Sequence, residues 1–235
     1  MKTEFDLIGF DADDTLWLNQ PNYDDIENEY CELLSNYIST EDVSKELYNI
    51  EMQNLSLYGY GAKSFMLSMI ETAIRITNNE VTQTTLNEII ILGKELINRP
   101  VSVLNGVQEV LEFFNETGII IILVTKGDLI DQERKLHKSN LEKYFHHIEI
   151  LSDKKESDYL KLLSRLDVES ERFLMIGNSL KSDIIPVLNI GGFGIHIPYH
   201  TNWQHDIVDK LGKHSNLIEV ENITEIIKLF KGKNI

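Results

Sequence analysis

The sequence predicts an α/β fold, with a Rossmann-like parallel sheet as its core and an inserted α-helical domain. Five short apolar segments alternate with helical patterns, which is the order that builds a parallel sheet with right-handed crossovers. Between the first and second of these segments lies a helical stretch of about 80 residues, from Asn22 to about Arg99, without a strand pattern. This stretch is too long for one crossover connection. We therefore expect a core domain of residues 1–17 and 100–235 and a helical domain of residues 18–99.

The predicted strands are short, mainly apolar runs, as expected for strands buried on both faces. They are Phe5–Phe10, Ile119–Val124, Ile148–Leu151, Phe173–Ile176 and Phe193–Ile197, with Leu217–Val220 as a further edge strand. Helical spacing of apolar residues predicts helices at Val107–Thr117, Leu129–Ser139, Tyr159–Leu166 and Ile184–Ile190. Gly118 is a C-cap signal, and Asn222 with Glu225 signals the start of the last helix.

The inserted region contains apolar residues at helical spacing throughout, and we expect four helices in it. The segment Leu57–Lys63 interrupts two of them, because Gly59 and Gly61 permit an irregular loop. Lys63 is a candidate substrate contact in this loop. A plain helix–helix turn with a solvated lysine fits the same residues equally well.

Composition excludes several classes of protein. The net charge of −16 argues against nucleic acid and anionic membranes as partners. Cys31 is the only cysteine, so no internal disulfide forms. No apolar run approaches the roughly 18 residues that span a bilayer, and the first residues lack the shape of a signal peptide. We expect a cytoplasmic protein, in which any phosphate ligand would need positive charge concentrated by a metal or a few lysines.

Three carboxylates, Asp11, Asp13 and Asp14, follow the first predicted strand. Because Asp and Thr are ordinary turn residues, an acidic turn would explain them. A buried unpaired carboxylate is costly, however, so acids at the end of a core strand also suggest a cation or a proton-sharing role. The spacing Asp11-x-Asp13-x-Thr15 resembles the first motif of the haloacid dehalogenase (HAD) superfamily.

Polar residues also follow the next two predicted strands. Thr125 and Lys126 follow one, where a hydroxyl and free backbone N–H groups suit a phosphate oxygen. Thr125 matches the Ser/Thr of the second HAD motif, although it could equally cap the next helix. Lys154 and Lys155 follow the other strand, and Lys154 is our choice for the lysine of the third motif. Glu156 replaces the usual proline, so Lys155 stays an alternative, as does a solvated lysine pair.

After the predicted strand Phe173–Ile176 comes Gly177-Asn178-Ser179, with Asp183 four residues beyond the serine. This segment is similar to the fourth HAD motif, in which two acids bind the metal. Asp183 matches the second acid, and Asn178 stands in place of the first. An amide oxygen ligates Mg²⁺ without adding negative charge. A first-turn acid favoured by the helix dipole would also explain Asp183.

Four partial motifs in the right order resemble those of a HAD hydrolase with a helical cap, of the phosphoglycolate phosphatase-like branch. The resemblance implies Asp11 as nucleophile and Asp13 as general acid/base. It implies Mg²⁺ held by the Asp11 carboxylate, the Asp13 backbone carbonyl, Asp183 and Asn178. Thr125 and Lys154 would hold the phosphoryl oxygens. Thr15 and Lys126 are added as candidate substrate contacts.

The implied activity is Mg²⁺-dependent hydrolysis of a small phosphorylated metabolite, a phosphomonoester, through an aspartyl-phosphate. Asp13 and Asp183 together favour phosphoryl chemistry over carbon–halogen cleavage, because haloacid dehalogenases lack the second Asp of the first motif. Two alternatives stay open. One is a phosphomutase of the same family, and the other is a catalytically silent protein that binds a phosphate-bearing ligand.

Overall fold

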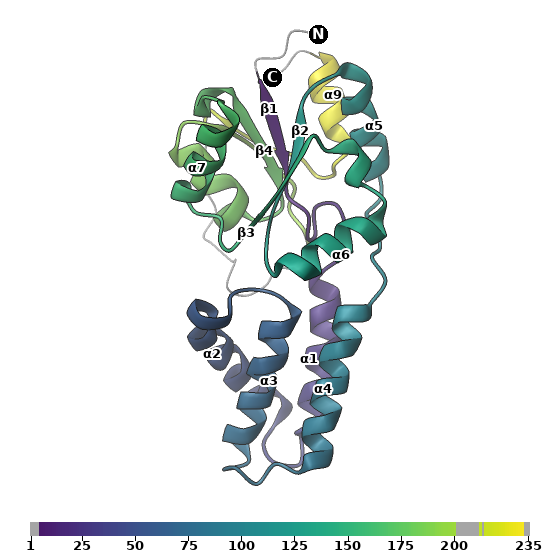
Figure 1. The fold of residues 1–235 in the computed structure, drawn as a ribbon, viewed down its shortest axis with the longest axis vertical. Coiled ribbons are helices and arrows are strands. Elements are labelled where there is room, and N and C mark those ends of the chain that lie inside the picture. Colours follow the sequence, from purple (N-terminus) through teal and green to yellow (C-terminus); the bar gives the residue numbers. More distant parts are fainter. Residues whose placement is uncertain (1–4, 201–211, 213, 233–235) are drawn as a thin grey trace. The chain divides into compact units, whose positions relative to one another are not determined.

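The computed structural model describes residues 5–200, 212 and 214–232. The chain forms two compact units, coloured by sequence in Figure 1. The first comprises Met1–Gln20, Val101–Lys126 and Arg134–Ile235, and the second comprises Pro21–Pro100 and Gly127–Glu133. Residues 127–133 thus belong to the second, helical unit, and the predicted range 18–99 does not include them.

The first unit is built on a parallel sheet, which confirms the predicted fold class. In the described part of the chain this sheet has six strands in the order β3-β2-β1-β4-β5-β6. Their bounds are β1 Leu7–Phe10, β2 Ile121–Lys126, β3 His147–Leu151, β4 Phe173–Gly177, β5 Phe193–His196 and β6 Leu217–Glu219. The second strand was predicted two residues too early, so Thr125 and Lys126 belong to β2 itself.

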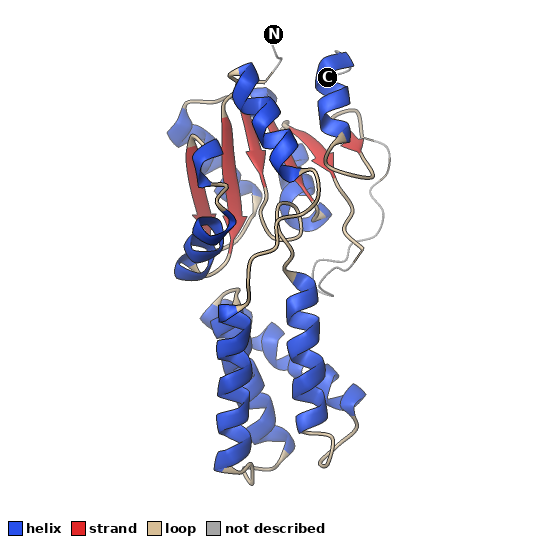
Figure 2. Cartoon of the chain, turned by 90° about the vertical axis from the view of Figure 1, so that its right-hand side faces the viewer, coloured by secondary structure: helices blue, strands red, loops and turns tan. Residues whose placement is uncertain are grey.

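Helices cover both faces of the sheet, as Figure 2 shows. They are α5 Val107–Thr117, α6 Leu129–Ser139, α7 Glu156–Leu166, α8 Ile185–Asn189 and α9 Glu225–Gly232. Alternate residues of β1 point to opposite faces, so Ile8 and Phe10 pack in the core that includes residues of α5 and α9. Leu7 packs in the second core, which includes Tyr159 of α7 and Val187 of α8.

The second unit contains the four predicted helices, α1 Gln20–Leu33, α2 Thr40–Tyr58, α3 Ala62–Ile76 and α4 Gln83–Asn98. The loop between α2 and α3 is shorter than predicted, because α2 continues through Tyr58 and Lys63 already lies in α3. The turn consists of Gly59, Tyr60 and Gly61, and its two glycines have φ of 69° and 112°. Residues that carry a Cβ rarely adopt such positive φ values, so both positions favour glycine.

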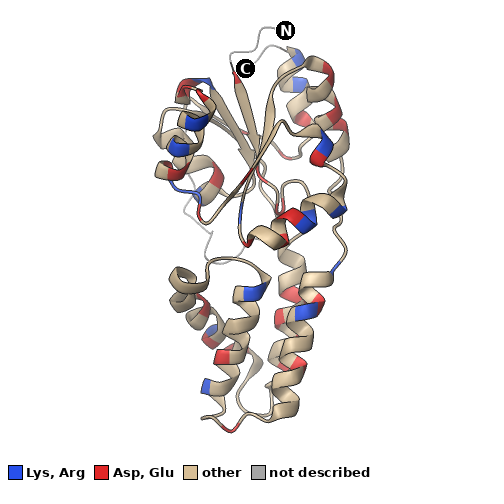
Figure 3. Cartoon of the chain, in the orientation of Figure 1, with Lys and Arg blue, Asp and Glu red and all other residues tan. Residues whose placement is uncertain are grey.

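Charged residues lie mainly on the helices and at the strand ends, while the strands are largely uncharged (Figure 3). Within the described ranges, no helix has the length and apolar character needed to cross a membrane.

Two partly buried carboxylates, Glu27 of α1 and Glu51 of α2, lie in the helical unit. Burial raises the pKa of Glu51 to about 8, and the charge of Glu27 adds to the shift. Burial also raises the pKa of Glu27, although a hydrogen bond from the Ser44 hydroxyl opposes this. Glu51 thus binds a proton in the folded chain over a pH range in which the unfolded chain releases it.

We predict that Glu51→Gln stabilises the protein at pH 8 but not at pH 4. Between the ordinary pKa of 4.5 and about 8, the folded state binds more protons than the unfolded state, so wild-type stability falls as pH rises. Gln removes this loss, and we expect a gain on the order of 2 kcal/mol, measured by urea unfolding across this range. Glu29→Gln, at an exposed position of α1, is the matched control. A gain independent of pH would contradict the prediction.

Candidate active site

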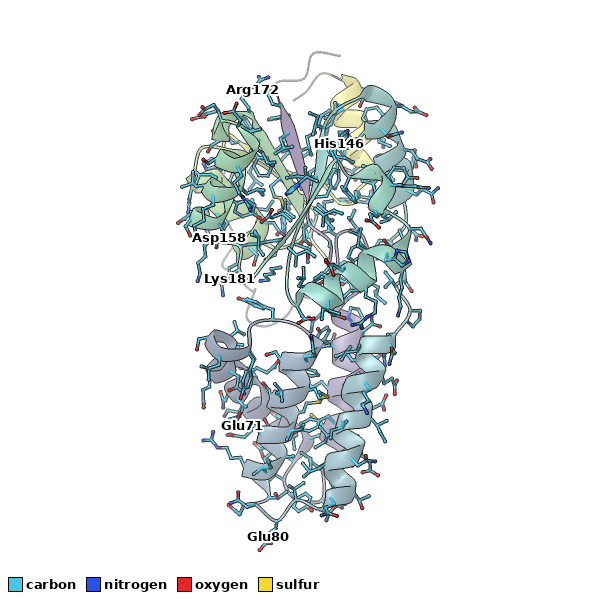
Figure 4. All side chains as sticks on the ribbon, in the orientation of Figure 1. Glu71, Glu80, His146, Asp158, Arg172 and Lys181 are labelled. Carbon is cyan, nitrogen blue, oxygen red and sulfur yellow. The ribbon has the colours of Figure 1, made fainter. Side chains whose placement is uncertain are left out.

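The candidate site lies at the carboxyl end of the sheet, where polar residues follow β1, β2, β3 and β4. Strand register explains why these ends meet. Phe10, the last residue of β1, is paired with Leu123 of β2 and Ile176 of β4. Figure 4 shows Lys181 at this end of the first unit and Arg172 at the opposite end, where it pairs with Asp6.

Lys154 lies between the carboxylates of Asp11 and Asp183. Its Nζ is 2.5 Å from Asp11 Oδ1 and 2.7 Å from Asp183 Oδ1. All three residues are buried, with 3%, 5% and 1% of their surfaces exposed for Lys154, Asp11 and Asp183. Three residues far apart in the sequence thus form one buried ionic cluster at this end of the sheet.

Lys155 lies outside this cluster. Its side chain is 72% exposed, and its Nζ is 2.9 Å from Asp153 Oδ2. The Lys154 backbone N–H also donates to Asp153, at 2.9 Å from Oδ1. Of the two lysines that the sequence left open, Lys154 is therefore the one that contacts Asp11.

Thr15 connects Asp11 to the loop after β4. Its hydroxyl is 3.0 Å from Asp11 Oδ2 and 3.1 Å from Asn178 Oδ1, and it accepts the Asn178 backbone N–H at 3.1 Å. The ring of His196, a buried residue of β5, lies with Nε2 3.0 Å from the Asn178 carbonyl oxygen. Because a carbonyl only accepts, Nε2 donates in this contact, while Nδ1 lies 3.1 Å from Glu219 Oε2. His196 therefore helps to position Asn178, a role that its sequence context did not indicate.

Asp183 is held in place by the turn that precedes it. The Ser179 backbone N–H donates to Asp183 Oδ2 at 2.9 Å. The segment Leu180–Ile184 is a π-helical turn, and such turns occur frequently at functional sites. The sequence predicted a helix only from Ile184, so this turn was missed. Gly177 makes room for the carboxylate, since a Cβ there would lie 2.4 Å from Asp183 Oδ2.

Asp13 lies beside α6. Trp17 Nε1 donates to Asp13 Oδ1 at 2.7 Å, and Lys135 Nζ lies 2.8 Å from Oδ1 and 3.1 Å from Oδ2. Lys135 was not among the predicted site residues. It lies on a predicted helix, and nothing in its neighbours along the chain indicates a partner more than 100 residues earlier.

Asp14 caps the start of α1. Its carboxylate accepts the backbone N–H groups of Asn19 and Gln20 at 2.8–3.1 Å, and its φ is 61°. Burial raises the pKa of Asp14 to about 7, although these two amides oppose the shift. Asp14 thus binds backbone N–H groups of its own loop. Of the three carboxylates, it is the one to which the acidic-turn interpretation applies.

The other predicted site residues have these positions. Thr125 is buried near the end of β2, next to β1 in the sheet. Lys126 donates to the Ser182 hydroxyl at 2.7 Å, so it contacts the turn that carries Asp183. Lys63 belongs to the helical unit and pairs there with Asp128, at 2.8 Å.

The buried cluster carries excess negative charge. Burial raises the pKa of Asp11, and the charge of Asp183 raises it further, to about 7, although Lys154 opposes the shift. Burial favours neutral Lys154, yet the two carboxylates raise the pKa of its ammonium above the usual value. One cation among two carboxylates leaves a net charge that a further cation would compensate.

The donor set suits Mg²⁺, which prefers oxygen ligands and is commonly held by one or two carboxylates together with waters. Asp11 and Asp183 supply carboxylates, and Asn178 supplies an amide oxygen bonded through Thr15 to the same cluster. Within the described residues, no group of three or more His, Cys, Asp or Glu side chains could hold a metal ion, so a metal here would also need the Asn178 amide, a backbone oxygen or water.

Comparison with known proteins identifies the family. The model of the haloacid dehalogenase-like hydrolases matches residues 5–191. The chain belongs to this family. A haloacid dehalogenase-like hydrolase from Xanthomonas campestris is 36% identical, with a TM-score of 0.86 over 98% of this chain and 93% of that one. The predicted family resemblance is therefore confirmed.

Two further relatives are more distant. Glyceraldehyde 3-phosphate phosphatase from Pyrococcus abyssi (strain GE5 / Orsay) is 24% identical over 135 residues, which span 55% of this chain and 55% of that protein. The chain thus matches only about half the length of this curated relative. A protein described as a predicted phosphoglycolate phosphatase from Haemophilus somnus 129pt is 17% identical, with a TM-score of 0.63 over 97% of this chain and 99% of that one. This last likeness shows a shared fold.

We predict that Lys154→Met destabilises this hydrolase by about 3–5 kcal/mol, because it leaves two buried carboxylates without their cation. Lys155→Met should leave the free energy of unfolding nearly unchanged, since it removes only an exposed ion pair. Urea unfolding at pH 7 of the two variants and the wild type measures both. Equal effects would show that the buried ammonium does not hold the cluster together.

We also predict that Gly177→Ala destabilises the protein by about 1–3 kcal/mol, because the added methyl overlaps the Asp183 carboxylate. A Cβ at Gly212 would meet nothing within 4 Å, so Gly212→Ala is the control. Thermal unfolding compares the two. A neutral Gly177→Ala would mean that Asp183 moves away from the backbone at no cost.

Proposed function

We propose that this HAD-like hydrolase is a Mg²⁺-dependent phosphatase that hydrolyses a small phosphomonoester through an aspartyl-phosphate. The observation that carries the proposal is the buried cluster of Asp11, Lys154 and Asp183. A carboxylate held against an ammonium at the rim of a parallel sheet is suited to attack a phosphoryl group, because the ammonium offsets the repulsion between two anions.

Asp11 is proposed as the nucleophile. One of its carboxylate oxygens forms a bond to phosphorus while the ester P–O bond breaks. Lys154 and Thr15 hold Asp11 in place, and Lys154 with Thr125 is proposed to bind the equatorial phosphoryl oxygens. Asp13 gives a proton to the leaving alkoxide and then takes one from the water that attacks the phosphorus. Inorganic phosphate leaves, and both carboxylates return to their starting states.

Mg²⁺ is proposed to be held by the Asp11 carboxylate, the Asp13 backbone carbonyl, Asp183 and Asn178. Bound there, it would supply positive charge to the phosphoryl oxygens. The Thr15 hydroxyl contacts both Asp11 and the Asn178 amide oxygen, which supports Asn178 as an oxygen donor in place of an acid. Lys126 acts on the same loop, through the Ser182 hydroxyl.

The substrate is proposed to be a small phosphorylated metabolite. The curated relative from Pyrococcus abyssi bears the name of a phosphatase for such a compound, glyceraldehyde 3-phosphate. The helical unit is proposed to be the cap, since its four helices are inserted between β1 and β2. Lys63 is proposed as its substrate contact. The single, buried Cys31 supports a cytoplasmic location.

We predict that the wild type releases phosphate from at least one member of a panel of phosphorylated metabolites, and that Asp11→Asn abolishes this release. EDTA should remove the activity and excess Mg²⁺ should restore it. Phosphate release, with mass spectrometry of acid-quenched enzyme to detect the aspartyl-phosphate, measures both. Asp6→Asn, at an exposed position at the other end of β1, is the control and should retain activity.

The same assay separates the alternatives. A phosphomutase would form the phosphorylated enzyme but return an isomeric phosphate ester, detectable by phosphorus NMR. A silent binding protein would give equal background release in wild type and Asp11→Asn. Either result would overturn the phosphatase proposal.

A further inference from the structure

Lys135 binds both oxygens of the Asp13 carboxylate and is itself directed by a third contact. Its Nζ lies 2.8 Å and 3.1 Å from Asp13 Oδ1 and Oδ2, and 2.9 Å from Asn19 Oδ1. An ammonium group carries three hydrogens. Three acceptors on one loop can therefore hold it in a single orientation, and Trp17 Nε1 donates to Asp13 Oδ1 at 2.7 Å.

The position of Lys135 is set by the packing of α6. The next residue, Leu136, is 3% exposed and lies in the core that contains Phe10 of β1. Ser139, one turn later, is also buried and donates to the Leu136 carbonyl oxygen at 2.7 Å. The turn of α6 that carries Lys135 is thus anchored to the same core as the strand that leads into Asp13.

Stability alone gives a weak reason for this arrangement. The side chains of Lys135 and Asp13 are 16% and 23% exposed, so solvent reaches both and weakens their electrostatic attraction. A proton-transfer group, in contrast, must lie within hydrogen-bond reach of the reacting atom in a defined orientation. Small misplacements of such groups are costly in rate.

We propose that Lys135 is a positioning residue that holds the Asp13 carboxyl group in the orientation in which it transfers a proton to the leaving group. The inference rests on the proposed phosphatase function. It concerns the orientation of the Asp13 carboxyl group, which the hydrogen bond from Trp17 Nε1 also restrains.

The dependence of rate on the leaving group tests this role. Glycerol 2-phosphate expels an alkoxide that needs a proton, whereas 2,4-dinitrophenyl phosphate expels a stable phenolate that needs none. In Lys135→Met we expect kcat/KM to fall about 10- to 100-fold for glycerol 2-phosphate. For 2,4-dinitrophenyl phosphate it should stay within about threefold of wild type, because kcat/KM reports steps up to the first irreversible bond cleavage.

Two further variants control the experiment. Lys138→Met removes the same charge from an exposed position of α6 and should leave both substrates unaffected. Lys135→Arg keeps a cation beside Asp13 and should recover part of the glycerol 2-phosphate rate. Melting temperatures of all variants show whether any loss comes from unfolding, and the Arg variant keeps the test valid if Lys135→Met unfolds.

The outcomes separate the inference from the function on which it rests. If the wild type releases phosphate from neither substrate nor any metabolite of the panel, or if Asp11→Asn releases it equally, the phosphatase proposal is overturned and the inference with it. If the wild type turns over both substrates, the inference alone is overturned when the Lys135 variants lose kcat/KM equally for both substrates or for neither. A loss confined to glycerol 2-phosphate and partly restored by Arg supports it.

Discussion

The ammonium of Lys154 between Asp11 and Asp183 is the interaction on which the site depends. Two carboxylates buried at the end of a sheet would repel each other and would each carry a large desolvation cost. The lysine offsets both effects, because its Nζ lies 2.5 Å from Asp11 Oδ1 and 2.7 Å from Asp183 Oδ1. It also links the residues that follow β1, β3 and β4. The charges of the site therefore balance only when these three strand ends pack together.

The same cluster explains why a further cation suits this site. One ammonium cannot neutralise two carboxylates. Burial raises the pKa of Asp11, and the charge of Asp183 raises it further, to about 7. The Thr15 hydroxyl contacts Asp11, and the Asn178 amide oxygen contacts Thr15, and neither adds charge. The site thus combines a strong demand for positive charge with ligands of the hard, oxygen type.

The acidic loop shows how neighbouring residues of one kind acquire different tasks. Asp11 points to Lys154, Asp13 to Lys135 of α6, and Asp14 to the backbone N–H groups at the start of α1. The left-handed backbone conformation of Asp14, with φ of 61°, helps to turn its carboxylate toward those groups. The loop therefore connects the strand that carries the proposed nucleophile to the first helix of the inserted unit.

The sequence by itself determined the order of strands and helices and the residues that gather at the strand ends. Buried strands, amphipathic helices and a motif such as Asp11-x-Asp13-x-Thr15 are local patterns, which can be read without coordinates. Only the tertiary structure decided between Lys154 and Lys155, gave Asp14 its capping position, and brought Lys135 to Asp13 and His196 to the Asn178 carbonyl. These contacts depend on strand register and helix packing between distant segments, and no local pattern encodes which of two adjacent lysines turns inward.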